Sequence, residues 1–125
     1  MSLALLPLVL VTACRPSDPL RVAAVQTGRS LNSDNTVGLH TTRFKPDQTM
    51  YVSVITANRG AGTLEAKWTF GGRVINEGKK EVSYNDQAAT EFHLQYAGKL
   101  PPGEYTVEIL LDGQSVGTRT LRVEP

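Results

Sequence analysis

The sequence predicts an all-β domain built as a sandwich or a barrel. No segment sustains the 3.6-residue apolar period of an amphipathic helix, whereas apolar and polar residues alternate with period two in several segments. Short runs rich in Gly, Asn and Asp separate these segments, as turns separate neighbouring strands. Seven or eight short strands with frequent turns are typical of sandwiches and barrels.

The first half of the domain is expected to begin with a strand at Leu20–Gln26. A polar loop follows at Gly28–Asn35, and Thr36–Phe44 holds a short edge strand. The strand expected at Thr49–Ala57 is rich in β-branched and aromatic residues, which favour strands. One face of it is predicted to enter the core with Met50, Val52, Val54 and Thr56.

The middle of the domain contains the clearest alternation. After a turn or loop at Asn58–Gly62, the strand Thr63–Phe70 is expected to point Leu64, Ala66, Trp68 and Phe70 inward. Gly71-Gly72 turns the chain into a short strand at Arg73–Ile75. A second turn at Asn76-Glu77-Gly78 then leads to a polar strand at Lys79–Tyr84, with Val82 inward, and a further turn at Asn85-Asp86.

Three strands are expected in the last third of the domain. Ala89–Tyr96 is predicted to point Phe92, Leu94 and Tyr96 inward, and Glu104–Leu111 to point Tyr105, Val107, Ile109 and Leu111 inward. Asp112-Gly113 is a strong signal for a type I′ hairpin turn into the final strand, Ser115–Val123. Gly117 would permit a β-bulge in that strand.

Three details narrow the fold. Trp68 lies on a central strand after Val54, and the run Pro101-Pro102-Gly103-Glu104-Tyr105-Thr106-Val107 opens a late strand with a Tyr two residues before an inward aliphatic residue. The pattern resembles the immunoglobulin-like fold with its tyrosine corner, and Val54 and Val107 stand where antibody domains place their inter-sheet cysteines. The resemblance implies an immunoglobulin-like or fibronectin-III-like antiparallel β-sandwich of seven or eight strands over residues 20–125. Trp68 and Tyr105 are then core and corner residues, not ligand platforms.

The N-terminus is predicted to be a cleavable signal segment. Residues 1–13 carry no charge, and the apolar run Leu3–Val11 is shorter than the ~20 residues that span a bilayer. Val11-Thr12-Ala13-Cys14 resembles the lipobox of bacterial lipoprotein signal peptides. This resemblance implies cleavage before Cys14, lipidation of Cys14 and a membrane-lipid partner. The alternative is a first strand or buried helix at Leu3–Ala13, with Cys14 as a core thiol.

Residues 14–19 are expected to form the lipidated cysteine and a short tether. Residues 15–19 contain two prolines, which favour an extended spacer. In lipoproteins of the enterobacterial kind, an Asp after the lipidated cysteine favours retention in the inner membrane. Arg15 occupies that position, so the resemblance favours the periplasmic face of the outer membrane.

Composition and motifs exclude several classes of protein. The formal net charge of +1 argues against a general nucleic-acid binder, and a single cysteine excludes an internal disulfide. No zinc, calcium or phosphate-binding motif occurs. We therefore predict no catalytic residues, no metal, no cofactor and no enzymatic activity. His93 and the pair Lys79-Lys80 are interpreted as solvated surface.

Two functional hypotheses from different classes remain. In the first, the domain is a binding or scaffold module that contacts another envelope protein through its loops or a sheet edge. In the alternative, it binds a carbohydrate or small ligand, for which Tyr51, Tyr84 and Tyr96 are the only aromatic side chains that could stack on a sugar ring. Tyr51, together with Ile55, either covers the edge of the core or belongs to a contact patch. The candidate partner contacts are Arg59, Tyr51, Tyr84, Asn85 and Asp86.

Overall fold

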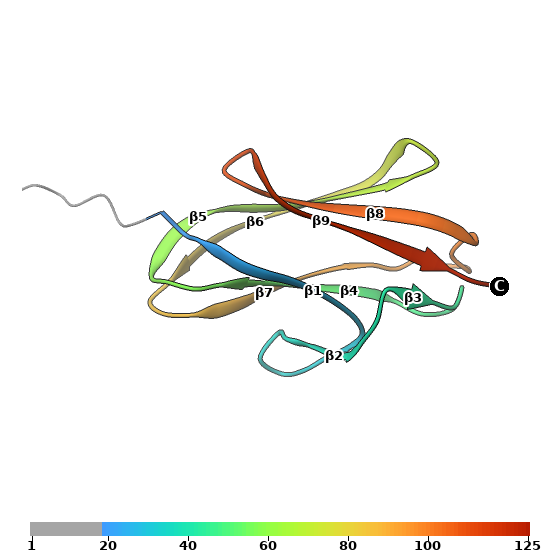
Figure 1. Cartoon of the computed structure of the whole chain (residues 1–125), viewed down its shortest axis with the longest axis horizontal. Coiled ribbons are helices and arrows are strands. Elements are labelled where there is room, and N and C mark those ends of the chain that lie inside the picture. The colour runs from blue at the N-terminus through green and yellow to red at the C-terminus, as the bar shows by residue number, and fades with distance from the viewer. Residues whose placement is uncertain (1–18) are drawn as a thin grey trace, which may run out of the picture.

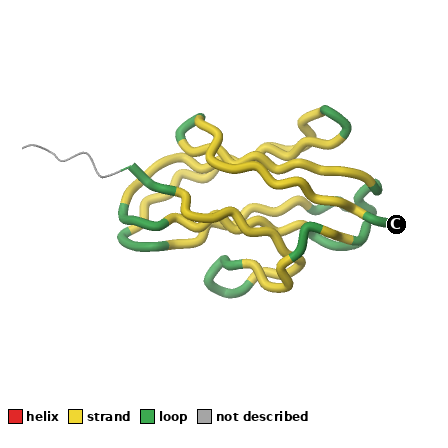
Figure 2. Tube along the Cα trace, in the orientation of Figure 1, coloured by secondary structure: helices red, strands yellow, loops and turns green. Residues whose placement is uncertain are grey.

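The computed structural model describes residues 19–125, which form two β-sheets packed face to face (Figures 1 and 2). The described residues contain nine strands and no helix, so the predicted all-β sandwich is confirmed, with one or two more strands than expected. The predicted signal segment at 1–13 and the lipidation site at Cys14 lie outside the described residues. Of the predicted tether, only Pro19 is described.

The two sheets contain four and five strands. The four-stranded sheet has the order β2-β1-β4-β7, with β1 at Val22–Leu31, β2 at Val37–His40, β4 at Met50–Thr56 and β7 at Ala88–Leu94. The five-stranded sheet has the order β3-β9-β8-β5-β6, with β3 at Arg43–Phe44, β5 at Gly60–Phe70, β6 at Arg73–Tyr84, β8 at Gly103–Leu111 and β9 at Gln114–Val123. Neighbouring strands are antiparallel except β3 and β9, which are parallel.

The core forms where the alternating faces of both sheets meet. Trp68 of β5 lies directly opposite Val107 of β8 and is 1% exposed, while Val54 of β4 is fully buried in the same cluster. Every second residue of β4, β5 and β8 therefore enters the core, as the sequence pattern predicts. Val54, Trp68 and Val107 are the central core residues that the immunoglobulin-like resemblance implies.

Tyr105 forms the predicted tyrosine corner. Its hydroxyl donates a hydrogen bond of 2.6 Å to the backbone oxygen of Pro101, four residues upstream, and its ring stacks on Phe70 with 4.4 Å between centroids. The side chain is buried, and this desolvation, followed by the nearby Tyr96, raises the pKa of the Tyr105 hydroxyl above its ordinary value. The hydroxyl therefore stays protonated and remains a donor.

The predicted loop at Gly28–Asn35 is wrong in its first half. β1 continues to Leu31 and forms a hairpin with β2, with Gly28 opposite His40. A Cβ at Gly28 would lie 2.4 Å from the backbone oxygen of Gly38, so the absence of a side chain permits this close pairing. A bulge between Val22 and Ala24 also shifts the faces of β1, so that Val25 is buried in the core and Val22 packs partly against it.

The turn predicted at Asn76-Glu77-Gly78 does not exist. Residues 73–84 form one continuous strand, β6, paired along its length with β5, which begins at Gly60 within the predicted loop Asn58–Gly62. Gly78 lies opposite Ala66, and a Cβ there would lie 3.6 Å from the ring of Phe92. The glycine thus lets an aromatic side chain pack against β6 and does not mark a turn.

The end of β7 also differs from expectation, whereas the last hairpin agrees. β7 ends at Leu94, and Tyr96, predicted to point inward, is 58% exposed. Asp112 and Gly113 have φ of 49° and 84°, the two positive values of the predicted type I′ turn. The β8–β9 register shifts by one residue next to Gly117, where a bulge is expected.

Candidate functional site

Four of the five predicted partner contacts lie at one end of the sandwich. Arg59 precedes β5, Asn85 and Asp86 follow β6, and Tyr84 is the register partner of Gly60. Arg59, Asn85 and Asp86 are exposed. Figure 1 shows both loops at the end where the described chain begins, and we call this end the entry end.

The entry end holds the start of the described chain through Asn58. The Asn58 side chain accepts a hydrogen bond of 2.9 Å from the backbone nitrogen of Arg21 and donates one of 3.0 Å to the oxygen of Pro19. The backbone nitrogen of Ala57 donates to the oxygen of Arg21 at 2.9 Å. These bonds fix the position of the chain before β1 begins.

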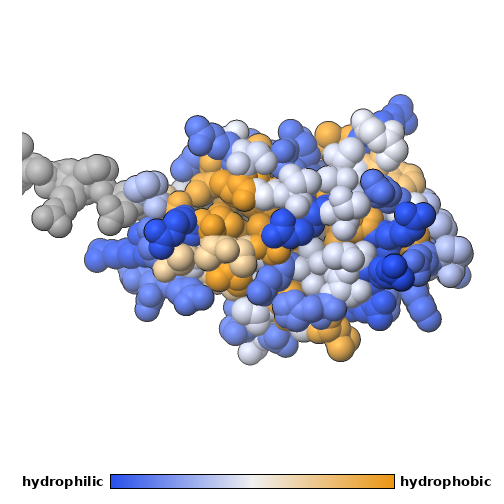
Figure 3. All heavy atoms as spheres, viewed as in Figure 1, coloured by the Kyte–Doolittle hydropathy of each residue, from blue (hydrophilic) through white to orange (hydrophobic). Residues whose placement is uncertain are grey.

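An open hollow of about 920 Å³ lies at the entry end. Its apolar lining comes from Leu20, Val22, Leu111 and Val116, and its polar lining includes Asn58 and Asp112. Figure 3 shows apolar side chains gathered on this part of the surface. The remaining lining residues are Pro19, Arg21 and Gln114.

Tyr51 lies away from the other four predicted contacts. It is half-buried on the outer face of β4 and sits opposite His93 of β7, with 6.0 Å between the ring centroids. Ile55 is also half-buried and lines a shallow hollow of about 230 Å³ with Asp34, Gln87 and Ala88. The structure therefore separates Tyr51 from the entry end.

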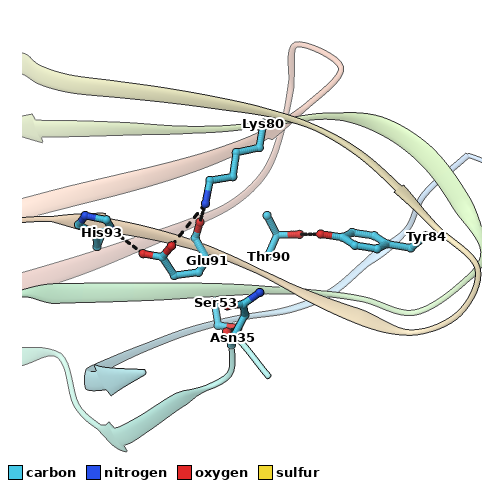
Figure 4. Close-up of polar contacts among 7 residues, drawn as sticks. All are labelled: Asn35, Ser53, Lys80, Tyr84, Thr90, Glu91 and His93. Carbon is cyan, nitrogen blue, oxygen red and sulfur yellow. Dashed lines mark hydrogen bonds and ion pairs between the residues drawn. The ribbon is translucent and has the colours of Figure 1, made fainter. Parts of the chain in front are cut away.

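A polar cluster joins the edges of the two sheets where β6 lies beside β7 (Figure 4). The ammonium of Lys80 donates to the backbone oxygen of Glu91 and lies 3.4 Å from its carboxylate Oε2. His93 Nδ1 contacts the other carboxylate oxygen of Glu91. The Lys80 stem also brings its ammonium to 5.1 Å from the centre of the Phe92 ring, within the range of cation–π attraction.

Tyr84 extends this cluster toward the entry end. Its hydroxyl lies 2.7 Å from Oγ1 of Thr90, so a second side chain of β6 contacts β7. Lys80 thus binds one backbone oxygen of β7 and Tyr84 contacts a side chain of β7, and we call this line of contacts the β6–β7 seam. β6 itself is the last strand of its sheet, and no described strand pairs with its other edge.

The sequence interpretation missed the role of Lys80 in this seam. Glu91 and His93 are two residues apart, which places them on the same side of a strand, but the partner on β6 comes from eleven residues earlier in the chain. The turn predicted at Asn76–Gly78 divides β6 into two short strands, so the sequence pattern does not indicate that Lys80 reaches β7.

No group of three or more His, Cys, Asp or Glu side chains within residues 19–125 is arranged to hold a metal ion. A shallow hollow of about 350 Å³ beside His93 is lined by Asn76, Gln95, Tyr96 and Ala97. The described part of the chain also has no helix with the length and apolar character that a membrane crossing needs.

Comparison with solved structures places the fold. An immunoglobulin-like protein from Pseudomonas aeruginosa superposes with a TM-score of 0.57 at 12% sequence identity, covering 84% of this chain and 96% of that one. At this identity the likeness shows the fold alone, and the chain therefore has an immunoglobulin-like β-sandwich. No curated protein sequence matches the chain. A family model matches residues 25–124, nearly the whole described sandwich, and the chain belongs to that family, described as "Domain of unknown function (DUF8428)".

Proposed function

We propose that this chain is a lipid-anchored protein of the bacterial cell envelope, and that its immunoglobulin-like domain binds another envelope protein and catalyses no reaction. The observation that carries the binding role is the open edge of β6. This strand has twelve residues and ends the five-stranded sheet, so one side of its backbone is available to a further strand.

The proposed anchor is supported by the sequence before the domain. Val11-Thr12-Ala13-Cys14 resembles a lipobox, and the chain contains no other cysteine. Four residues lie between Cys14 and Pro19, and the five steps from Cα to Cα in an extended chain, at about 3.5 Å each, span about 18 Å. A lipid on Cys14 would therefore hold the entry end close to the membrane, on the outer-membrane side that Arg15 favours.

If the entry end faces the membrane, the proposed partner binds at the side of the sandwich. Arg59, Asn85 and Asp86 lie at the entry end and would face the lipid surface. The β6 edge runs along the length of the domain, so most of it lies away from the entry end. Lys80 binds one backbone oxygen at the neighbouring edge of β7, and β6 is the longer of the two edge strands on that side.

The carbohydrate hypothesis receives less support. A sugar site of the expected kind needs several tyrosines on one face, and Tyr84 is engaged with Thr90 in the seam while Tyr51 lies on the outer face of the other sheet. Tyr96 lines the shallow hollow beside His93 without a second tyrosine in its lining.

Site-specific photo-crosslinking in intact cells tests the proposal. A photoreactive residue at Glu81, on the exposed side of β6, should give an adduct with a protein partner. The matched control is Thr120 on β9, which is exposed on the same sheet but lies away from the β6 edge. No adduct at Glu81, or equal adducts at both positions, would overturn binding through β6.

A further inference from the structure

We propose that the partner of the β6 edge is a second copy of this chain, and that two β6 strands pair antiparallel around a two-fold axis at Gly78. The pairing joins two five-stranded sheets into one continuous sheet. This inference rests on the proposed function, because it names the partner of the same sheet edge.

The edges of the described sandwich differ in what they offer to another strand. β2 has four residues and β3 has two, too few for a long ladder. β7 has seven residues, and its backbone oxygen at Glu91 is already bonded to Lys80. β6 has twelve residues and pairs on one side only, with β5. Among the edge strands of the described sandwich, β6 therefore offers the longest ladder to an added strand.

The outer face of the five-stranded sheet carries alternating charges that end at β6. Across the strands, Glu108 lies opposite Lys67, and Lys67 lies opposite Glu77. In the neighbouring row, Glu65 lies opposite Lys79. One row thus ends at the edge with a negative charge and the next with a positive charge. A strand that continues both rows must present a positive residue to Glu77 and a negative residue to Lys79.

A second β6 meets this requirement in one register. In an antiparallel pair, directly opposite side chains lie on the same face, so a two-fold axis between identical strands lies midway between two copies of the same residue. With the axis at Gly78, Glu77 of each copy lies opposite Lys79 of the other. This arrangement gives two opposite-charge pairs and extends both rows into the second sheet.

The neighbouring registers bring like charges together. An axis at Lys79 places Lys79 opposite itself and Glu77 opposite Glu81, and an axis at Glu77 places Glu77 opposite itself. An axis at Lys80 pairs Lys79 with Glu81, but it places Lys80 opposite its own copy and leaves Glu77 opposite Ser83, without a positive partner. Like charges directly opposite each other destabilise a strand pair, so the charges select the Gly78 register.

Gly78 and Lys79 also suit the pairing of two β6 strands through their size and their charge. Gly78 has no side chain, and its inner side is covered by Phe92, so the axis passes through a part of the strand without bulk at the edge. Lysines on an edge strand discourage pairing with an indifferent strand. Opposite a glutamate, the same lysine instead favours one partner over others, which makes Lys79 a specificity element.

Co-purification of two full-length copies that carry different tags tests this inference. The copies are co-expressed, purified through one tag and compared with variants in which a charge of the pair is reversed. Wild-type copies should co-purify. Glu77→Lys in both copies places lysine opposite lysine, and Lys79→Glu in both places glutamate opposite glutamate. We expect each to reduce co-purification by about tenfold or more, because two attractive pairs become repulsive. One Glu77→Lys copy with one Lys79→Glu copy restores both pairs and should restore co-purification.

The control is Glu81→Lys, which makes the same charge change on the same exposed face but lies opposite Ile75 in the Gly78 register. It should leave co-purification unchanged, and circular dichroism checks that each variant is folded. Wild-type copies that do not co-purify, or a mixed pair that fails to recover, would overturn the inference. If the Glu81 crosslink then identifies a different protein, the proposed function stands while the second copy is excluded.

Discussion

Lys80 of β6 and Glu91 of β7 join the edges of the two sheets. The lysine ammonium donates to the backbone oxygen of Glu91, a group on the outer edge of β7, and lies 3.4 Å from its carboxylate. The Glu91 side chain is 14% exposed and the Lys80 side chain 45%, so this pair lies at the partly exposed edge of the sandwich. Lys80 thus joins the two sheets on this side and occupies one backbone oxygen of β7 to which another strand would otherwise bind.

Lys80→Ala should lower the free energy of unfolding by about 1 kcal/mol, because it removes one charged hydrogen bond and one cation–π contact at a partly exposed site. It should also increase amide hydrogen exchange along β7. Lys99→Ala is the matched control, since Lys99 is exposed in the connection between β7 and β8. Equal losses of stability in the two variants would contradict the role assigned to Lys80.

Trp68→Ala should lower the free energy of unfolding by about 3–5 kcal/mol, as expected when a large core side chain is removed. Trp68 is 1% exposed and belongs to the core cluster that includes Val54 and Val107. Chemical denaturation measures the change. Lys67→Ala, the preceding residue on the outer face, should cost less than about 0.5 kcal/mol, and a loss below about 1 kcal/mol for Trp68→Ala would contradict the core placement.

Tyr105→Phe should lower the free energy of unfolding by about 1 kcal/mol through loss of the hydrogen bond to Pro101. The ring stays stacked on Phe70, so the fold persists. Tyr96→Phe serves as the control because Tyr96 is largely exposed. If thermal denaturation places Tyr105→Phe and wild type at the same midpoint, the corner hydrogen bond does not contribute to stability.

The raised pKa of Tyr105 predicts an alkaline effect on stability. Above the ordinary value of 10.0, the unfolded chain loses the phenolic proton first, because burial keeps the folded hydroxyl protonated. The folded state then binds more protons than the unfolded state, so stability falls as pH rises through this window. Denaturation curves at pH 10 and above should show a smaller decrease for Tyr105→Phe than for wild type.

The period-two alternation predicts the central strands and the core because each of these strands has one face buried in the core and one face on the outside of the sandwich. Val54, Trp68 and Val107 are all buried, and Asp112-Gly113 forms the expected turn. These elements depend on local chemistry and on burial of one face, and both are visible in a single sequence.

The edge strands could not be predicted in the same way. β6 is exposed on its outer face and polar along most of its length, so Gly78 resembled a turn residue when its packing against Phe92 was unknown. The β6–β7 seam depends on residues brought together by sheet packing, and no local pattern encodes that proximity. The sequence pattern predicts Arg59 and Asn85 in exposed loops, but their shared position at the entry end follows from the topology.

Cys14→Ala should move the protein from the membrane fraction to the soluble periplasmic fraction. Two or more acyl chains, at about 0.8 kcal/mol for each buried methylene, hold a protein firmly at a membrane, and the variant lacks their attachment atom. Metabolic labelling with an alkyne fatty acid should mark the wild type and leave Cys14→Ala unmarked. Ser17→Ala, a change in the predicted tether, is the control and should stay labelled and membrane-bound. A wild-type protein that takes up no label, or a Cys14→Ala protein that stays fully in the membrane fraction, would refute the anchor.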